Sequence, residues 1–334
     1  MFISLLALFG GIAIFLFGLK TISQGTESFI TGAKKRVLNK VIKTPLLGAL
    51  TGMVVAGVTQ SSVAVSFITV GLVESGLIPF IASAPIIMGA NVGTTVTAQL
   101  VSLSGGSGVI IGSISSIIGL LLGFSKNQRA KMIGDALMGL GLIFAGLSIM
   151  DTEIVKLVDF GWFKSLFLIN SPVALFLNGM IMTAVVQSSS AITGITVLLS
   201  GKGLIGFKNA VYLTLGSNVG SCFSVVVASA TKSLQARRTS IFNLVFNFIG
   251  AMIFFPIIII FGDKLTALFL NDNTDLKRAI ANFHTIFNLF SAILLLPFYK
   301  LLTTVIEKFI VDKPTSSKKK EKCKTFTSKI RRFN

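Results

Sequence analysis

The chain contains one segment twice, and in both copies a glutamine followed by serines interrupts an apolar stretch. Gly52 to Ser62 reads Gly-Met-Val-Val-Ala-Gly-Val-Thr-Gln-Ser-Ser, and Gly179 to Ser190 reads Gly-Met-Ile-Met-Thr-Ala-Val-Val-Gln-Ser-Ser-Ser. The separation of 127 residues between Gln60 and Gln187 also relates Asn91 to Asn218, each of which precedes Val-Gly. Duplicated segments with polar, glycine-containing centres are typical of proteins whose ligand site lies between two membrane repeats.

The composition predicts an all-α polytopic membrane protein. Of 334 residues, 52% are hydrophobic and 13% are charged, against about 25% charged residues in soluble domains. Apolar stretches that approach or exceed the ~20 residues of a membrane span occur at 2–19, 107–124, 132–150, 241–261 and 283–302. The first is interpreted as a retained helix and not a signal peptide, because it lacks a basic leader and 132–150 is its repeat counterpart.

The distribution of charge favours two repeats of opposite orientation. The net charge is +18, but the basic residues lie in short connections and a tail, which argues against nucleic acid as a partner. Connections alternate between the copies: 20–43, 125–131 and 231–238 are basic, while 151–170 and 262–275 are acidic or mixed and 103–107 is uncharged. The positive-inside rule places the basic connections in the cytoplasm. Four basic residues oppose this scheme by falling outside: Lys202, Lys208, Lys277 and Arg278.

These patterns divide the chain into three parts. We predict a first membrane repeat at 1–130, a second at 131–306, and a basic, disordered cytoplasmic tail at 307–334. The tail is expected to lie near anionic lipid headgroups, the alternative being a solvated tail with no specific partner. The predicted location is the plasma membrane, as in a bacterial inner membrane.

Each copy of the motif predicts a re-entrant helical hairpin followed by a broken transmembrane helix. The segment 45–75 is too long for one crossing, so we expect arms at 46–58 and 61–74 with a tip near Gln60. The second hairpin would run from Pro172 to a tip at Gln187–Ser190 and return along 191–200. Irregular backbone at membrane depth is tolerated inside protein or along a watery cavity. The alternative is two ordinary helices joined to their neighbours by small polar residues.

The hairpin tips predict a site for an anion together with a cation. A helix that restarts after Gln60 or Gln187 directs free N–H groups and a positive dipole end at the tip, which suits phosphate or sulfate. Because no basic residue lies at either tip, sodium would balance the anion's charge. The residues predicted to bind phosphate are Gln60, Ser61, Ser62, Gln187, Ser188, Ser189 and Ser190. Those predicted to bind Na+ are Gln60, Asn91, Thr94, Thr95, Gln187, Ser190, Asn218 and Ser221.

The two Gln-Ser-Ser motifs, each followed by Gly-(Ala/Ser)-Asn-Val-Gly, resemble the type II sodium-phosphate cotransporter family and its bacterial relatives. The resemblance covers about residues 5–300. It implies sodium-driven symport of inorganic phosphate, inverted repeats and a transport site at the two tips. The Phe242-Asn243 pair is similar to one that follows the second motif in relatives. The sequence departs from the family pattern at Val63, where many members have a third serine, and at Cys222, where threonine is usual.

Other functions stay open at this point. Ser62 or Ser189 as the nucleophile of a membrane hydrolase would need a base within reach, and His284 is the only histidine; we therefore predict no enzyme and no cofactor other than Na+ as coupling ion. A phosphate exporter, a carrier of arsenate or sulfate, and a non-transporting phosphate sensor are the alternatives. Elevator-like movement is a hypothesis based on the long connections 20–43 and 151–170. His284 is interpreted as an interfacial polar anchor, the alternative being a role in proton coupling. Asp135 is interpreted as an interfacial partner of Lys131, the alternative being a cation site within the membrane.

Overall fold

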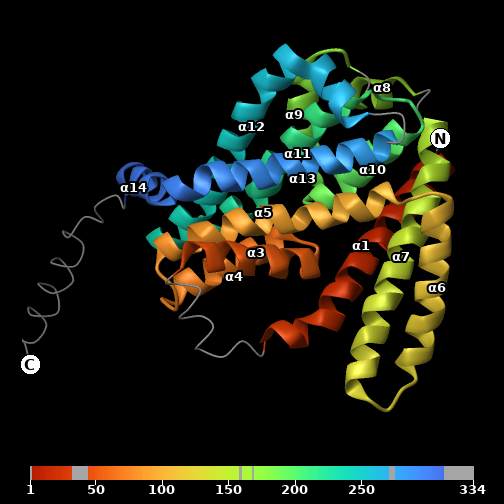
Figure 1. The fold of residues 1–334 in the computed structure, drawn as a ribbon, viewed down its shortest axis with the longest axis horizontal. Coiled ribbons are helices and arrows are strands. Elements are labelled where there is room, and N and C mark those ends of the chain that lie inside the picture. Colours follow the sequence, from red (N-terminus) through yellow and green to blue (C-terminus); the bar gives the residue numbers. More distant parts are fainter. Residues whose placement is uncertain (1, 32–43, 158–159, 168, 271–274, 312–334) are drawn as a thin grey trace, which may run out of the picture.

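All regular structure in the described part of the chain is helical. The computed structural model describes residues 2–31, 44–157, 160–167, 169–270 and 275–311, and Figure 1 shows their helices. Seven candidate spans among these residues are long and apolar enough to cross a membrane. The chain is therefore a multi-pass membrane protein, as its composition predicts.

The helix boundaries show the same repeat as the sequence. Helices α3 (Pro45–Thr59), α4 (Ser62–Glu74) and α5 (Phe80–Ser102) have the same lengths as α9 (Pro172–Val186), α10 (Ser189–Gly201) and α11 (Phe207–Ser229). Each first helix begins with proline, whose fixed φ suits the first helical position. The hairpin arms are confirmed, with the second return arm starting at Ser189, slightly before the predicted 191.

Glycines allow α3 to lie directly on α5 and α9 to lie directly on α11. A Cβ atom added to Gly89 would lie 1.8 Å from the carbonyl oxygen of Ala49, and one added to Gly216 would lie 1.9 Å from that of Phe176. Such distances leave no room for a side chain, so the two backbones touch. Close approach of this kind is the usual role of small residues between membrane helices.

This packing corrects the prediction of a broken helix at the Asn-Val-Gly segments. Helices α5 and α11 continue through Asn91 and Asn218 without interruption. The glycines beside these asparagines serve helix contact, and a helix interior tolerates each at a cost of about 1 kcal/mol. The backbone of each repeat is instead interrupted at Gln60 and Gln187.

Three helices form a lobe beside the hairpins: α1 (Phe2–Thr31), α6 (Gly106–Gly123) and α7 (Gln128–Leu157). A Cβ atom added to Gly18 would lie 2.6 Å from the oxygen of Gly139, and one added to Gly146 would lie 2.6 Å from that of Gly11. Gly11 and Gly18 are seven residues apart in α1, as Gly139 and Gly146 are in α7, and the first glycine of each pair meets the second of the other. Their contacts are thus reciprocal and antiparallel, which is consistent with a two-fold axis relating inverted repeats.

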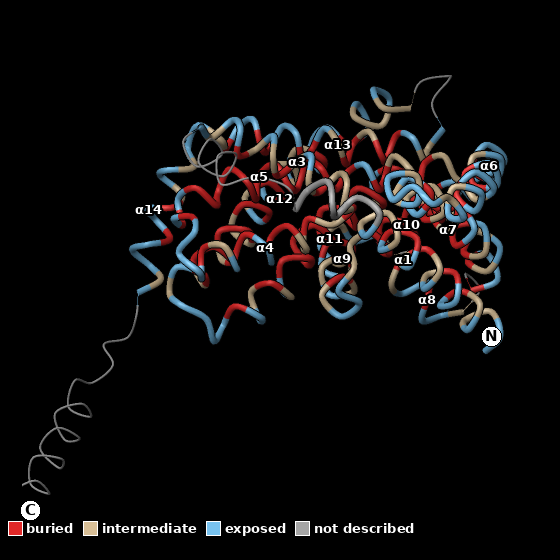
Figure 2. Tube along the Cα trace, turned by 90° about the horizontal axis from the view of Figure 1, so that it is seen from below, coloured by how far each residue is buried: buried red, intermediate tan, exposed pale blue. Residues whose placement is uncertain are grey.

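The two equivalent helices α5 and α11 lie at the centre of the molecule. Within their apolar windows 89% and 78% of residues are buried, against 22% in α6 and 28% in α12 (Leu234–Phe269). Figure 2 shows this buried centre in red. Helix α13 (Leu276–Leu295) packs against both, and η1 (Leu296–Phe298) and α14 (Tyr299–Phe309) follow it. The short α8 (Gly161–Phe167) precedes α9.

Parts of the predicted connections and tail lie outside the described residues. Helix α1 continues past the predicted span to Thr31, and 32–43 belongs to the undescribed part of the basic connection. Helix α14 covers the predicted start of the tail, and 312–334 lies outside the description. Helix α7 likewise extends into the connection 151–170, as far as Leu157.

The four basic residues that oppose the predicted orientation all have partners. Lys202 pairs with Asp151 and Lys208 with Asp263, each at 2.7 Å. The other two donate to neutral acceptors of the first repeat, Lys277 to the backbone oxygen of Ser104 and Arg278 to Oε1 of Gln99, both at 3.0 Å. Their positions are therefore accounted for by local bonds within the protein.

Candidate functional site

Each hairpin turns at its glutamine. Gln60 and Gln187 have φ of 55° and 57°, and in the described chain they are the residues other than glycine with positive φ. A left-handed backbone costs a residue with a Cβ atom on the order of 1 kcal/mol. Both tips thus place a strained glutamine at the end of one helix, directly before the start of the next.

The serine after each glutamine caps the returning helix. Ser61 Oγ accepts from the backbone N–H of Ala64 at 3.1 Å, and Ser188 Oγ accepts from that of Ala191 at 3.2 Å. A cap of this kind satisfies one of the free N–H groups of a helix start and leaves those of the first two helical residues directed at the tip. The hydroxyl hydrogens of both cap serines remain available for an acceptor such as a phosphate oxygen.

The following serines begin the helices and are largely enclosed. Ser62 is 7% exposed and Ser190 is 9% exposed, whereas Ser189 is half-buried. One turn further along α4, the hydroxyl of Ser66 is buried without a hydrogen-bond partner among the described residues. Each tip therefore combines a positive helix end with several hydroxyl groups and no charged side chain.

Four hydroxyl groups are predicted to bind Na+, and all are buried: those of Thr94 and Thr95 lie on α5, that of Ser221 on α11 and that of Ser190 on α10. Thr94 donates to the oxygen of Ala90, Thr95 to that of Val92, and Ser221 to that of Asn218. A hydroxyl that donates to its own helix keeps its lone pairs free for another partner. These residues can therefore present oxygen atoms to a cation while their hydrogens stay bonded.

Asn91 is linked to α12. Its Nδ2 donates to Ile87 O at 2.9 Å and to Asn243 Oδ1 at 3.4 Å, and Asn243 Oδ1 also accepts from Asn247 Nδ2 at 3.1 Å. Because the nitrogen of Asn91 is used in these bonds, its amide oxygen is the atom available to a ligand. The Phe242-Asn243 pair therefore contacts the first repeat through the hydrogen bond between Asn91 and Asn243. This contact could not be predicted from the sequence alone.

Asn218 is linked to α13 by a closed ring of hydrogen bonds. Its Nδ2 donates to Asn288 Oδ1 at 2.9 Å, and Asn288 Nδ2 donates to the backbone oxygen of His284 at 2.9 Å. The remaining contact joins His284 Nε2 to Asn218 Oδ1 at 3.0 Å. Since Oδ1 can only accept, Nε2 carries the hydrogen, and the imidazole takes the tautomer protonated there.

This ring corrects the interpretation of His284 as an interfacial anchor. The side chain is 3% exposed, and its Nδ1 is buried without a hydrogen-bond partner among the described residues. His284, whose role the sequence analysis misassigned, and Asn288, which it missed, thus fix the orientation of a predicted ligand. The available signal was the dipeptide Phe287-Asn288, which repeats Phe242-Asn243. Asp135, by contrast, is an exposed residue of α7.

The two tip glutamines have different surroundings. Gln60 is buried, its Oε1 accepts from Thr97 Oγ1 at 2.8 Å, and its Nε2 donates to Gly57 O. Gln187 is exposed and lines a cavity of about 510 Å³. The first hairpin reaches this cavity through Val63, one residue after Ser62. The remaining lining residues are Phe67, Ala184, Phe223, Ser224, Val227 and Ala228.

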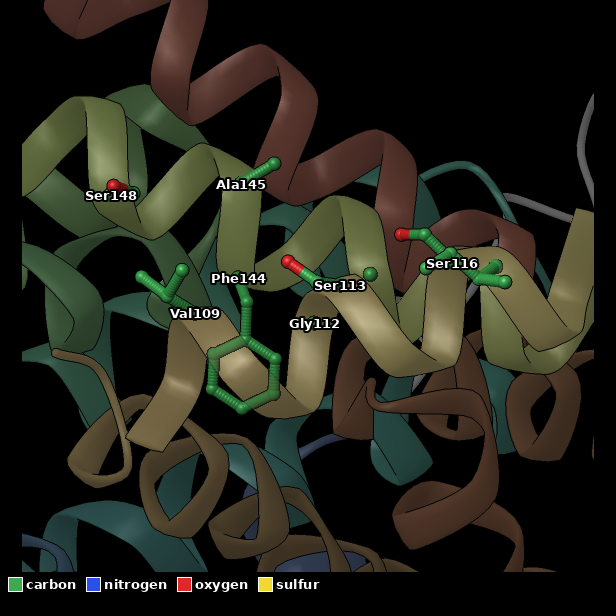
Figure 3. A pocket seen from close by; sticks show the side chains of 9 residues that line it. Val109, Gly112, Ser113, Ser116, Phe144, Ala145 and Ser148 are labelled. Atoms are coloured by element: carbon green, nitrogen blue, oxygen red, sulfur yellow. The ribbon is translucent and has the colours of Figure 1, made fainter. Parts of the chain in front are cut away.

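A second cavity, of about 480 Å³, lies between α6 and α7 (Figure 3). Ser113, Ser116 and Ser148 provide its hydroxyl groups, beside Phe144. None of the predicted site residues lines it. Of these two cavities, the one at Gln187 coincides with the repeated motif.

Comparison with known proteins gives the family. A family described as Na+/Pi-cotransporter matches residues 14–152 and 165–289, which include both hairpins and both long central helices. This chain belongs to the Na+/Pi-cotransporter family. The resemblance noted from the two Gln-Ser-Ser motifs is thereby confirmed.

Individual relatives of this Na+/Pi-cotransporter family member differ in how much of each chain aligns. An uncharacterized Bacillus subtilis protein, YqeW, is 31% identical over 88% of this chain and 96% of its own length. The Escherichia coli protein named "Putative inorganic phosphate export protein YjbB" is 25% identical over 93% of this chain, which spans 57% of that relative. Bovine sodium-dependent phosphate transport protein 2B is 43% identical over 20% of this chain and 9% of its own. No solved structure is a match.

Proposed function

We propose that this chain moves inorganic phosphate across a membrane in symport with Na+, and that both ions bind at the tips of the α3–α4 and α9–α10 hairpins. The proposal depends chiefly on one observation: in a member of this family, both tips pair a left-handed glutamine with a serine-capped helix start. Helix starts of this kind bind oxyanions through their N–H groups and dipole.

In this proposal the ligands of Na+ come from the helices on which the hairpins pack. Neutral amide and hydroxyl oxygens of Asn91, Thr94, Thr95, Asn218 and Ser221 belong to α5 and α11, the helices on which the hairpins pack. Hard cations take oxygen ligands, and a cation next to phosphate offsets part of the cost of desolvating each ion. Gln60 and Gln187 would contribute through their amide oxygens, and Ser190 through its hydroxyl.

The orientation in a bacterial inner membrane follows from the charged connections. The segment with Lys232 joins α11 to α12 and is assigned to the cytoplasm, as is the basic tail. Val227 and Ala228, near that end of α11, line the Gln187 cavity. In this scheme the structure is open toward the cytoplasm. The lobe of α1, α6 and α7 would be the scaffold against which the hairpins move in an elevator-like cycle.

Export of phosphate is the second candidate. It is favoured by the printed name of the Escherichia coli relative, which aligns with 93% of this chain. Both candidates use the same site, and they differ in the gradient that drives net movement.

The test is uptake of radiolabelled phosphate into proteoliposomes, with an inward Na+ gradient and with K+ in its place. Gln187→Ala and Ser189→Ala should each remove most Na+-dependent uptake, because they change the open tip. Ser113→Ala, in the separate cavity between α6 and α7, is the matched control and should retain it. Equal phosphate uptake with Na+ and with K+ would contradict coupling to Na+. Phosphate efflux without uptake would favour export. Crosslinks between the hairpins and the lobe that leave transport intact would contradict the elevator-like cycle.

A further inference from the structure

The two tip glutamines have the same backbone and opposite side-chain environments. Gln60 is 5% exposed and accepts a hydrogen bond from Thr97, which is 2% exposed. Gln187 is exposed and lines the cavity between the hairpins. Since φ differs by only 2° between them, the difference lies in what surrounds each amide.

The second repeat has its own counterpart of Thr97. Ser224 follows Thr97 by the same 127 residues that separate Gln187 from Gln60. It is half-buried, lines the same cavity as Gln187, and donates to Ser221 O at 3.2 Å on its own helix. Serine and threonine both offer a hydroxyl that can donate to an amide oxygen. Each repeat therefore contains a glutamine and a hydroxyl residue at equivalent positions. The two side chains are hydrogen-bonded in the first repeat, whereas in the second the Ser224 hydroxyl donates to its own helix.

We propose that Thr97 and Ser224 are positioning residues that hold the glutamine of their own hairpin tip in alternation. In this structure Thr97 holds Gln60 while the second tip is open. When the repeats exchange conformations, Ser224 holds Gln187 and the first tip opens. Two equivalent segments in different states give a second conformation by exchange, with access on the opposite side. This inference rests on the proposed function, because it describes how the transport site changes sides.

A specific asymmetry follows from the bond between Thr97 and Gln60. Without the Thr97 hydroxyl, Gln60 Oε1 loses its donor only in the conformation seen here, because Gln60 is exposed in the other. Loss of one buried hydrogen bond therefore shifts the equilibrium toward that other conformation, by about five- to tenfold. Removing the Ser224 hydroxyl shifts it the opposite way.

The test measures cysteine labelling and not transport. Val227→Cys, in the open cavity, and its first-repeat counterpart Leu100→Cys report the two conformations in a Cys222→Ser, Cys323→Ser background. The purified protein is placed in lipid nanodiscs without Na+ or phosphate and labelled with a charged maleimide. Thr97→Val should slow labelling at position 227 and accelerate it at position 100, so that the ratio of the rate at 227 to the rate at 100 falls about five- to tenfold. Ser224→Ala should slow labelling at position 100.

Two controls define the result. Thr97→Ser keeps the hydroxyl and should keep both labelling rates, and Thr214→Val removes a buried hydroxyl that bonds only its own helix and should also leave both unchanged. A ratio of the two rates that stays within about twofold in Thr97→Val, or rates that move in the same direction at both positions, would overturn the inference. If Na+-dependent uptake is present while the rates do not shift, the inference fails alone. If the rates shift as expected without phosphate uptake, the proposed function fails and the exchange stands.

Discussion

His284 donates from Nε2 to Oδ1 of Asn218 at 3.0 Å, and this bond fixes which way the Asn218 amide faces. The donor sits on α13 and the acceptor on α11, both near the centre of the molecule. An uncharged imidazole suits this place, because a charged one would bring a second N–H to a buried position that has no acceptor among the described residues.

Replacement of His284 should therefore weaken the apparent affinity for Na+. In His284→Leu the Asn218 amide loses its donor, and we expect the Na+ concentration for half-maximal phosphate uptake to rise about fivefold or more. His284→Gln can place an amide N–H near the position of Nε2 and should stay within about twofold of the unmodified protein. The same rise in both variants, measured in Na+ titrations of uptake, would argue against a role for the N–H.

Substitutions of Ser188, the cap serine of the second hairpin, can distinguish an effect on stability from an effect on anion binding. Ser188→Asp keeps a good N-cap, so the melting temperature in detergent should be unchanged or slightly raised. The added carboxylate repels phosphate at the same helix start, and uptake should be lost. Ser188→Ala should instead lower stability by about 1 kcal/mol. Retained phosphate uptake in Ser188→Asp would place the anion elsewhere.

The contact between α9 and α11 has no space at Gly216. A methyl group there would lie 1.9 Å from the backbone oxygen of Phe176, so Gly216→Ala must separate the helices and should cost about 3 kcal/mol or more. Gly71→Ala is the matched control, because nothing lies within 4 Å of its Cβ position and alanine favours helix. Thermal unfolding in detergent compares the two. Equal melting temperatures would mean that the two backbones are not in direct contact.

A pH-dependent contact joins the first hairpin to α12. Glu74 Oε2 accepts from the backbone and the hydroxyl of Ser233, and the Ser233 hydroxyl bond is the main cause that lowers the Glu74 pKa. A lowered pKa stabilises the fold above the ordinary carboxyl range, and this contribution is lost as pH falls through the folded value. Glu74→Gln should thus melt slightly below the unmodified protein at pH 7, and the difference should shrink as the pH falls below the ordinary carboxyl range. A difference in melting temperature that does not decrease with falling pH would contradict this assignment.

The hairpins could be predicted because their signal is local and present twice. Pro45 and Pro172 mark the helix starts, and glutamine followed by serine marks each turn at one constant spacing. The continuity of the helices through the Asn-Val-Gly segments could not be predicted in the same way. Glycine both weakens a helix and permits another backbone to touch it, and only the position of Ala49 against Gly89 shows that the second effect applies.

The burial of His284 was missed for a different reason. The last apolar stretch was predicted to begin at 283, which placed His284 at the end of a helix, whereas α13 begins at Leu276. The stripe of His284, Asn288 and Ser291, spaced by four and three residues on one helix face, pointed to the interior. The difference between Gln60 and Gln187 lay beyond sequence reasoning, because equivalent residues in a duplicated chain have the same local pattern in either conformation.

The reciprocal contacts of α1 and α7 have a consequence for genetics. Gly11 meets Gly146 and Gly18 meets Gly139. The effect of a substitution at one of these glycines should therefore be compensated or worsened by a second substitution in the other repeat, about 120 to 135 positions away. Substitutions at 11 and 146 should be strongly non-additive, while those at 11 and 18, on one helix but at different contacts, should be nearly independent. Non-additive pairs of substitutions in this protein would then follow the contacts between the two repeats and not the separation along the chain.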